Sequence, residues 1–572
     1  MDISSFDSRY PFPLDAFQRR AIEALAAGES VLVAAPTGAG KTVVAEYAVE
    51  RAVSREGKAF YTTPLKALSN QKYGDFVARY GAKRVGLLTG DNSINGEAPV
   101  VVMTTEVLRN MLYERSPTLE GLEVVIMDEV HYLQDPYRGA VWEEVLIHLA
   151  PSAAVVCLSA TVSNAEEFGD WLGTLRGATR VVIEEDRPVP LESRYLIDRE
   201  LVPMHVRRSG RIVANPAVRS RIRRLEGEGR GRGRASDRRR SPRLKPRRED
   251  VVSLLAAEGM LPAIYFVFSR AGCDRSVEFL VSAGLDLTSR EERERIGEFV
   301  DLRAAWVGEE DLSALRFATF REGLVRGIAA HHAGMVPVFK ETVEELFTAG
   351  LVKVVFATET LSLGINMPAK TVVLEDLWKF SGERHEVLTP GEFTQLTGRA
   401  GRRGIDSVGY GVVLHQRQLE FDQVAGLASR RTYELRSSFR PSYNMAVNLM
   451  RNFTPEQAHS LLNASFGQFQ ADRSAASLAR QVDRDRAGLD GYREHVQCDR
   501  GDFSEYWRLR EEVNEIRRAA SRTRESRQKA AVRDRLATLR PGDVVHVPRA
   551  SRRGLAVVVG ALEGRPTLIT HY

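Results

Sequence analysis

The stretch that decides the fold occupies residues 35–42 and reads Ala35, Pro36, Thr37, Gly38, Ala39, Gly40, Lys41 and Thr42. An apolar run of β-strand character precedes it, and apolar residues at helical spacing follow it. A strand, a glycine-containing turn and a helix start form a phosphate cradle, in which backbone N–H groups and the helix dipole meet the anion. Lys41 is then placed to reach the outer phosphates, and the Thr42 hydroxyl to hold Mg²⁺. The consensus loop opens with Gly rather than Ala35, so the alternative is an ordinary strand–helix turn.

Length and composition set the protein class. The chain has 572 residues, of which 43% are hydrophobic and 27% charged, as in a folded protein of about four structural units. No run of about 18 apolar residues appears, so we expect no membrane span. The N-terminus lacks the apolar core of a secretory signal. Cys157, Cys273 and Cys498 lie far apart without metal-ligand spacing, which indicates reduced thiols and a cytoplasmic location.

The positive charge is concentrated in one segment. The chain has a net charge of +5, but residues 219–248 contain 14 Lys and Arg against 3 Asp and Glu, so the remainder is net negative. Gly-Arg repeats and few aliphatic residues predict a disordered, solvated segment within a linker at residues 186–250. A tether and a non-specific attraction to nucleic-acid phosphates are compatible explanations.

Apolar strand-like runs alternate with helical patterns over residues 8–185, which predicts an α/β domain with a parallel sheet and helices on both faces. Four runs, at residues 59–61, 100–103, 124–127 and 155–158, each end in a polar cluster. Ligands bind beyond the carboxyl ends of parallel strands, so we expect these clusters at one edge of the sheet. Their notable members are Pro64, Lys66, Thr104, Thr105, Asp128, Glu129, His131, Ser159 and Thr161.

Three side chains outside the loop are candidates for nucleotide chemistry. A carboxylate at the tip of a buried strand needs a positive neighbour, which the Mg²⁺ of a nucleotide supplies to Asp128. Glu129 is then predicted to orient and deprotonate the attacking water. The alternative for this pair is a helix N-cap. Gln18 is predicted either to hydrogen-bond an adenine edge or to lie in an amphipathic helix covering a sheet edge.

A second α/β unit is predicted over residues 251–425, without a phosphate loop of its own. Polar clusters containing Arg270, Thr358 and Gly364 follow its strand-like runs. The later stretch at residues 395–404 places arginines beside glycines, which lets guanidinium groups approach a phosphate closely. Alone it fits a solvated basic turn. Beside the first domain, Arg399 and Arg402 are predicted to be arginine fingers that stabilise a phosphoryl transition state.

Taken in order, these motifs resemble the series of the superfamily 2 helicases. The sequence Asp128-Glu129-Val130-His131 is similar to that of the DExH RNA helicases of the superkiller/exosome-cofactor family, and within it of the bacterial HelY group. Residues 331–335 and 439–445 also resemble that family. The resemblance extends from residue 8 to the C-terminus, and an ordered series is more specific than any single motif.

The resemblance implies two RecA-like domains that close over ATP and Mg²⁺ and move 3′–5′ on single-stranded RNA in RNA processing or decay. It assigns the loop at residues 35–42, Gln18 and Gly364 to ATP, and Thr42 and Asp128 to Mg²⁺. Lys41, Glu129, Gln395, Arg399 and Arg402 would be catalytic. The nucleic-acid contacts would be Pro64, Lys66, Thr104, Thr105, Arg270 and Thr358, and the coupling residues His131, Ser159 and Thr161. It further implies a monomer without a membrane partner that works with RNA-degradation machinery.

The family also implies an organisation for the C-terminal part. We expect a winged-helix-like module at residues 426–470, a helical stalk at 471–540 and a partial arch β-domain at 541–572. A break near Gly501 fits an antiparallel helical hairpin, although two separate surface helices fit the pattern equally. The sequence stops at Tyr572, before the return stalk and the ratchet helical domain that the family has. Either it is a fragment, or the protein lacks part of its translocation machinery, which would put processive unwinding in doubt.

Two rival functions remain at this point. One is a DNA helicase of the related repair branch. The other is a nucleic-acid-binding scaffold without productive turnover, which the intact Lys41, Glu129 and Arg402 disfavour.

Overall fold

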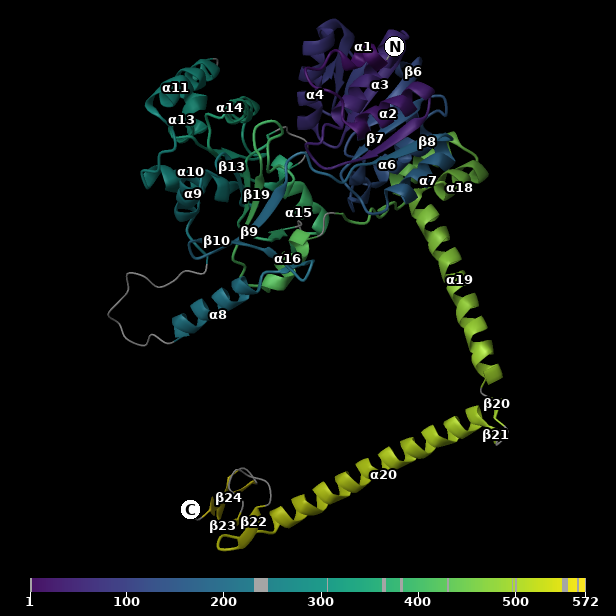
Figure 1. The fold of residues 1–572 in the computed structure, drawn as a ribbon, viewed down its shortest axis with the longest axis vertical. Coiled ribbons are helices and arrows are strands. Elements are labelled where there is room, and N and C mark those ends of the chain that lie inside the picture. Colours follow the sequence, from purple (N-terminus) through teal and green to yellow (C-terminus); the bar gives the residue numbers. More distant parts are fainter. Residues whose placement is uncertain are drawn as a thin grey trace. The chain divides into compact units, whose positions relative to one another are not determined.

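The computed structural model describes residues 3–230, 245–305, 307–362, 367–380, 384–429, 432–495, 497–498, 501–547, 554–562 and 565–570 (Figure 1). The chain divides into two compact units, Met1–Ala471 and Asp472–Tyr572. None of the described helices is long and apolar enough to cross a membrane.

The first sheet has the strand order β4-β3-β5-β2-β6-β7-β1-β8. Its strands are β1 (Ser30–Ala34), β2 (Lys58–Thr63), β3 (Val85–Leu88), β4 (Ser93–Ile94), β5 (Val100–Thr104), β6 (Leu122–Met127), β7 (Ala154–Ser159) and β8 (Thr179–Ile183). Neighbouring strands are parallel, except for β3 and β4. The four apolar runs with polar ends are β2, β5, β6 and β7, so their carboxyl ends meet at one edge as predicted.

Helices cover both faces of this sheet. They are α1 (Ile3–Asp7), α2 (Ala16–Ala27), α3 (Thr42–Ser54), α4 (Lys66–Tyr80), α5 (Thr105–Glu114), α6 (Ala140–His148) and α7 (Ala165–Arg176), with short 3₁₀ turns η1 (Ala82–Arg84), η2 (Pro117–Leu119) and η3 (Val130–Gln134). Strand side chains alternate between the faces. Val31 and Val33 of β1 therefore join one core with α2 and α3, while Leu32 and Ala34 join another with Trp142.

The second sheet has the order β10-β9-β19-β16-β13-β15-β14. Its strands are β9 (Leu191–Ile197), β10 (Glu200–Pro203), β13 (Ala263–Phe266), β14 (Ile328–His331), β15 (Val354–Ala357), β16 (Thr371–Leu374) and β19 (Gly409–Leu414). All neighbours are parallel except β9 and β10. Ile264 and Phe266 face one core, and Tyr265 faces the other. The α/β class with two parallel-dominated sheets, as in tandem RecA-like domains, is thereby confirmed.

Helices and two hairpins complete the second domain. The helices are α8 (Pro216–Arg230), α9 (Arg248–Ala257), α10 (Arg270–Ser282), α11 (Arg290–Ala304), α12 (Glu309–Ala314), α13 (Phe317–Val325), α14 (Pro337–Thr348), η4 (Glu359–Ser362), α15 (Pro390–Thr397) and α16 (Phe421–Ser429). The hairpins pair β11 (His205–Arg208) with β12 (Arg211–Ala214) and β17 (Trp378–Phe380) with β18 (His385–Val387).

The structure differs from the predicted linker at residues 186–250, and over residues 219–230 it also differs from the predicted disorder. Strands β9 and β10 belong to the second sheet, and the basic segment begins inside α8. Val218 and Leu225 of α8 are buried in the core of the second domain, and Ile222 packs against it. Apolar residues at this spacing lie on one face of a helix, and that pattern outweighs the arginine-rich composition. Residues 231–244 lie outside the described part of the chain.

The segment after the second domain packs on the first domain. It contains α17 (Tyr443–Asn452), α18 (Pro455–Asn463) and the start of α19 (Phe466–His495), and its described residues form no sheet of their own where a winged-helix-like module is predicted. The Ser163 N–H donates to Tyr433 O (2.8 Å), and the Asn164 side chain bonds both backbone groups of Leu435. Phe466 is fully buried between aromatic rings of α7.

The second unit holds the predicted stalk and terminal β region. Helix α20 (Phe503–Ala537) follows a short antiparallel pair, β20 (Gln497–Cys498) and β21 (Gly501–Asp502). Strands β22 (Val544–Val547), β23 (Gly554–Leu562) and β24 (Arg565–Thr570) form an antiparallel sheet. Leu478 of α19 and Ile516 of α20 are each 62% exposed, so these apolar positions do not form a buried seam. Antiparallel packing of the two helices stays a prediction.

Candidate active site and interdomain cleft

The loop at residues 35–42 connects β1 to α3 and has the backbone that a phosphate cradle needs. Gly38 (φ +82°) and Gly40 (φ +89°) lie in the left-handed region, where glycine has no steric penalty. Ala35 is buried and keeps a negative φ, so an alanine fits where the consensus has glycine. Lys41 Nζ donates across the loop to Ala35 O (2.7 Å) and Pro36 O (3.1 Å). Burial lowers the pKa of Lys41, and the carboxylates of Glu129 and Asp128 oppose that shift.

Gln18 holds this loop from helix α2. Its side chain is 1% exposed, its Oε1 accepts from the Asp15 N–H (2.8 Å), and its Nε2 donates to Gly40 O (2.9 Å). The first of these bonds is half of a capping box that starts α2. Gln18 therefore lies in the amphipathic helix and also touches the phosphate loop. The adenine contact stays a prediction.

Asp128 and Glu129 follow β6 directly. Asp128 is 8% exposed, and it accepts from the Tyr61 hydroxyl (2.6 Å) and the Glu129 N–H (2.9 Å). Burial and the neighbouring Glu129 raise the pKa of Asp128. Glu129 itself has φ +52°, a conformation that costs an L-residue roughly 1–2 kcal/mol. Strain of this kind is retained at functional sites, and here it directs the Glu129 N–H toward Asp128.

These donors fit a magnesium nucleotide. Mg²⁺ prefers oxygen ligands and keeps several waters, so the Thr42 hydroxyl, the Asp128 carboxylate and phosphate oxygens suit it. A cation would also offset the charge repulsion between the buried Asp128 and the partly exposed Glu129. Within the described residues, no cluster of three or more His, Cys, Asp or Glu forms an all-protein metal site, and a nucleotide-bound Mg²⁺ does not need one.

His131 joins three segments. Its Nδ1 accepts from the Ala160 N–H (3.3 Å) and lies 3.4 Å from Glu129 Oε2, while its Nε2 contacts the Gln395 side chain of α15. Burial and Lys41 lower the pKa of His131 to about 3, so the ring is neutral. A backbone N–H can only donate, so Nδ1 is the acceptor and the ring proton lies on Nε2, the atom that faces the side-chain amide of Gln395. Ser159 and Thr161, which flank Ala160, are both buried.

The arginine-rich loop at residues 398–403 lies against the phosphate loop. A Cβ added to Gly398 would lie 3.3 Å from Thr37 Cβ. Arg399 is 7% exposed, and burial lowers its pKa to about 10 against the opposing effect of Glu129. Arg402, the second predicted finger, instead makes a bidentate pair with Asp406 (2.8 and 2.9 Å).

Two further arginines were not singled out from the sequence. Arg403 donates to both oxygens of Asp15 (2.8 and 2.9 Å) and to Ala39 O in the phosphate loop (3.1 Å). Arg187, in the segment between β8 and β9, donates to Gly398 O (2.9 Å) and Ala400 O (2.8 Å). The adjacent arginines at 402 and 403 could have indicated from the sequence that Arg403 lies at the site, whereas no local pattern relates Arg187 to Gly398.

A cavity of about 660 Å³ lies between the two domains. The first domain lines it with the ends of β2 and β5 and the start of α6, including Pro64, Leu65, Lys66, Thr104, Glu106 and Arg138. The second domain lines it with His331, His332, Lys340, Glu344 and Thr360, among others. Three predicted nucleic-acid contacts, Pro64, Lys66 and Thr104, therefore share one cleft.

The other predicted contacts lie beside this cleft rather than in its lining. Thr105 Oγ1 donates to Thr63 O (3.2 Å), and the Thr358 hydroxyl bonds that of Thr360 (2.9 Å). Arg270 is exposed at the start of α10. Gly364 lies outside the described residues.

His331 and His332 are buried, and they also line the cleft. His331 Nε2 contacts Glu344 Oε1 (2.8 Å), and His332 Nε2 contacts Asp274 Oδ1 (2.9 Å). His332 Nδ1 in addition accepts from the Gly334 N–H (3.2 Å). These contacts orient both rings in the wall of the cleft that the second domain provides.

Comparison with known proteins agrees with this arrangement. The DEAD/DEAH box helicase family matches residues 15–168, and the helicase conserved C-terminal domain matches residues 275–404. The probable helicase HelY of Mycobacterium tuberculosis (strain ATCC 25618 / H37Rv) is 53% identical over 583 residues, covering 100% of this chain and 64% of that protein. The DExH-box ATP-dependent RNA helicase DExH15 chloroplastic of Arabidopsis thaliana is 40% identical over 79% of this chain and 41% of its own length.

A third relative is the superkiller complex protein 2 of Homo sapiens, 40% identical over 82% of this chain and 38% of its own length. The chain thus spans less than two thirds of these relatives. The two matched ranges contain the phosphate loop, the Asp128–Glu129 pair and the loop of Arg399 and Arg402. The chain belongs to the Ski2-like helicases of superfamily 2.

Proposed function

We propose that this chain is an ATP-dependent RNA helicase that hydrolyses Mg-ATP to move 3′–5′ along single-stranded RNA in RNA processing or decay. One observation carries the proposal. One edge of the first sheet, made by the ends of β1, β2, β5, β6 and β7, contains both the phosphate loop region and one wall of the cleft. The second domain faces this edge at the phosphate loop and across the cleft. In this proposal, a conformational change at the nucleotide site is therefore transmitted to the cleft through one edge of the sheet.

The residues have distinct roles in this proposal. Lys41 would bind the outer phosphates, and Thr42 and Asp128 would hold Mg²⁺, which would supply positive charge next to the phosphate groups. Glu129 orients and deprotonates the attacking water. Arg399, buried beside Glu129, stabilises the transferred phosphoryl group. Gln395 contacts His131, and this contact communicates the position of Arg399 to the first domain. Arg402 acts as a second finger once it releases Asp406.

The cleft favours recognition of a backbone over recognition of bases. Among the described residues, its lining includes no Trp, Tyr or Phe on which bases could stack. Lys66, Lys340 and Thr104 provide cationic and hydroxyl groups that suit phosphate and sugar. RNA is favoured over DNA because one relative is named an ATP-dependent RNA helicase and another belongs by name to a superkiller complex. RNA-degradation machinery in the cytoplasm is the partner class that follows.

The decisive experiment is ATP hydrolysis by the chain alone, with single-stranded RNA and with DNA of the same sequence at fixed salt. We expect RNA to stimulate hydrolysis more strongly than DNA. Duplexes with a 3′ or a 5′ single-stranded tail then test direction, and only the 3′ tail should support unwinding. Stronger stimulation by DNA would favour the repair branch. Binding without any hydrolysis would leave only the scaffold.

A further inference from the structure

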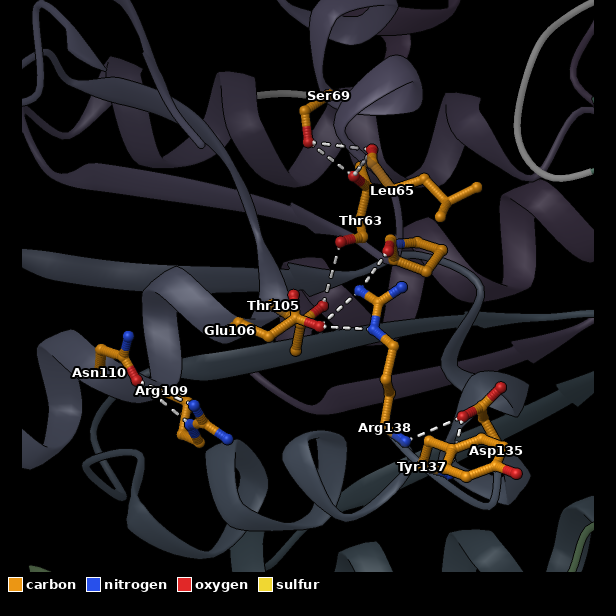
Figure 2. A network of polar contacts seen from close by, with 11 residues as sticks. Thr63, Leu65, Ser69, Thr105, Glu106, Arg109, Asn110, Asp135, Tyr137 and Arg138 are labelled. Atoms are coloured by element: carbon orange, nitrogen blue, oxygen red, sulfur yellow. Dashed lines mark hydrogen bonds and ion pairs between the residues drawn. The ribbon is translucent and has the colours of Figure 1, made fainter. Parts of the chain in front are cut away.

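Arg138 occupies a junction between the cleft and the segment that carries Glu129 (Figure 2). Its Nε donates to Glu106 Oε1 (2.8 Å), and one terminal nitrogen contacts the same oxygen and donates to Pro64 O (2.6 Å). Its backbone N–H donates to Asp135 Oδ1 (2.8 Å). One guanidinium thus joins the loops that end β2 and β5, both of which line the cavity.

The two loops are held at their other ends as well. Thr105 Oγ1 donates to Thr63 O (3.2 Å), which ties the start of α5 to the end of β2. The Thr63 hydroxyl donates to Leu65 O (2.9 Å) and bonds the Ser69 hydroxyl (2.7 Å), as Figure 2 shows. Pro64 is therefore held from within its own loop, and Arg138 adds a contact from its side chain to Pro64 O.

The backbone between Glu129 and Arg138 is short and closely packed. It runs through η3 to Asp135, whose carboxylate accepts from the N–H groups of Tyr137 and Arg138 (3.0 and 2.8 Å). Ser438, from the segment after the second domain, donates to Leu133 O (2.7 Å) and Asp135 O (2.8 Å). A Cβ added to Gly139 would lie 2.1 Å from Leu133 O, so this closely packed turn has no room for a side chain there.

We propose that Arg138 is a positioning residue that couples the nucleic-acid cleft to the setting of Glu129. Nucleic acid that contacts the Pro64 and Glu106 loops displaces or stabilises them, and Arg138 transmits that change to the turn that begins at Glu129. The coupling is reciprocal, so ATP binding also alters nucleic-acid affinity. This inference rests on the proposed function, because it takes the cleft to be the path of the nucleic acid.

The chemistry of the side chain explains why an arginine stands here. A guanidinium has a planar fork of donors and can satisfy a carboxylate and a carbonyl at the same time. A lysine ammonium can hold Glu106, but it does not fix the relative orientation of two acceptors. Arg138→Lys should therefore retain only part of the coupling.

The test compares Arg138→Ala and Arg138→Lys with a matched control, Arg180→Ala. Arg180 lies on β8 of the same domain and pairs with Glu29 at the surface. For each protein, ATP hydrolysis is measured without and with single-stranded RNA, together with the RNA concentration for half-maximal stimulation and the melting temperature. We expect the RNA-stimulated rate of Arg138→Ala to fall about tenfold more than its RNA-free rate. Arg138→Lys should be intermediate, and the control should match the wild type.

A second variant, Glu106→Gln, keeps one acceptor oxygen and should give a smaller loss of stimulation. Combined with Arg138→Ala it should add little, because both changes remove the same contact. Equal falls of the RNA-free and RNA-stimulated rates, with a lower melting temperature, would show a purely structural role and overturn the inference. Undiminished stimulation in Arg138→Ala would also overturn it. If RNA fails to stimulate the wild type, the proposed function itself fails, before any variant is compared.

Discussion

Arg403 pairs with Asp15 through two hydrogen bonds of 2.8 and 2.9 Å, although 388 positions separate the two residues in the chain. Asp15 precedes the helix whose Gln18 holds Gly40, and Arg403 also reaches Ala39 O. The first helix of the ATP site, the phosphate loop and the arginine-rich loop thus form one connected network. The pair is one of the links between the two domains beside the phosphate loop.

This link should matter for closure over ATP. Because both side chains are partly exposed, solvent and salt weaken their attraction. We expect Arg403→Ala to raise the KM for ATP about two- to fivefold at an ionic strength of about 0.05 M, and less at about 0.3 M. Steady-state ATPase assays at both ionic strengths measure this. Arg290→Ala, which breaks an exposed pair on α11, is the control. The double exchange Asp15→Arg with Arg403→Asp should restore part of the loss, and a salt-independent effect would contradict the pairing.

Glu129→Gln should separate binding from turnover. The carboxamide preserves shape but cannot accept a proton, so we expect ATP affinity to be retained while hydrolysis falls at least about 100-fold. Binding of a fluorescent ATP analogue and phosphate release measure the two properties. Glu120→Gln, an exposed glutamate of the same domain, should change neither. Normal turnover in Glu129→Gln would remove Glu129 from its assigned role.

Gly40→Ala should damage the phosphate loop. The added Cβ would meet Gln18 Nε2 at 2.8 Å, and φ is +89°, which alanine tolerates poorly. An alanine at this positive φ is strained by roughly 1–2 kcal/mol, so the loop backbone must shift to relieve the strain. We therefore expect ATP affinity to fall about tenfold. Gly173→Ala in α7 is the matched control, because its Cβ meets nothing within 4 Å and alanine favours a helix. Equal ATP binding by both variants would show that the loop does not need its left-handed glycine.

Glu143 should make stability depend on pH. It is fully buried under the segment after the second domain, where it accepts from the Ser437 hydroxyl (2.5 Å) and the Phe466 N–H (2.7 Å). Burial raises its pKa from 4.5 to about 7, against these hydrogen bonds. A carboxyl with a raised pKa favours the fold while it is protonated, and this contribution is lost as the pH rises through about 7.

The corresponding measurement compares the melting temperatures of the wild type and Glu143→Gln between about pH 5 and pH 8. The shift corresponds to about 3 kcal/mol, so the wild type should lose stability relative to the variant as the pH rises. Glu120→Gln, at an exposed position, should follow the wild type throughout. A constant difference between wild type and Glu143→Gln across the range would show that Glu143 does not titrate there.

The parts of this site that the sequence predicted are local. The phosphate loop, the Asp128–Glu129 pair and the polar ends of β2, β5 and β7 each depend on residues within one strand and the turn after it. Strands β14 and β19 are harder to recognise from the sequence, because Ala329, Ala330 and Gly411 have low β-strand propensity. Helix α8 was misjudged from its composition, although Val218 and Leu225 already marked a buried face.

The parts that were missed depend on distant segments. Nothing near Arg187 indicates that it will bind the carbonyls of Gly398 and Ala400, because those carbonyls lie more than 200 positions away. The same holds for Ser438 and the turn at Leu133. The Arg402–Asp406 pair was visible in principle as an i, i+4 contact, but phosphate and Asp406 compete for the same guanidinium, and local sequence does not decide between them.

The course of the chain has a mechanical consequence. It leaves the first domain through Arg187, and it comes back at Tyr433 and Leu435, which bond the segment after β7. Two segments of the chain, instead of one, therefore connect the second domain to the first. Two such connections restrict how far the two domains can move apart more than a single connection would.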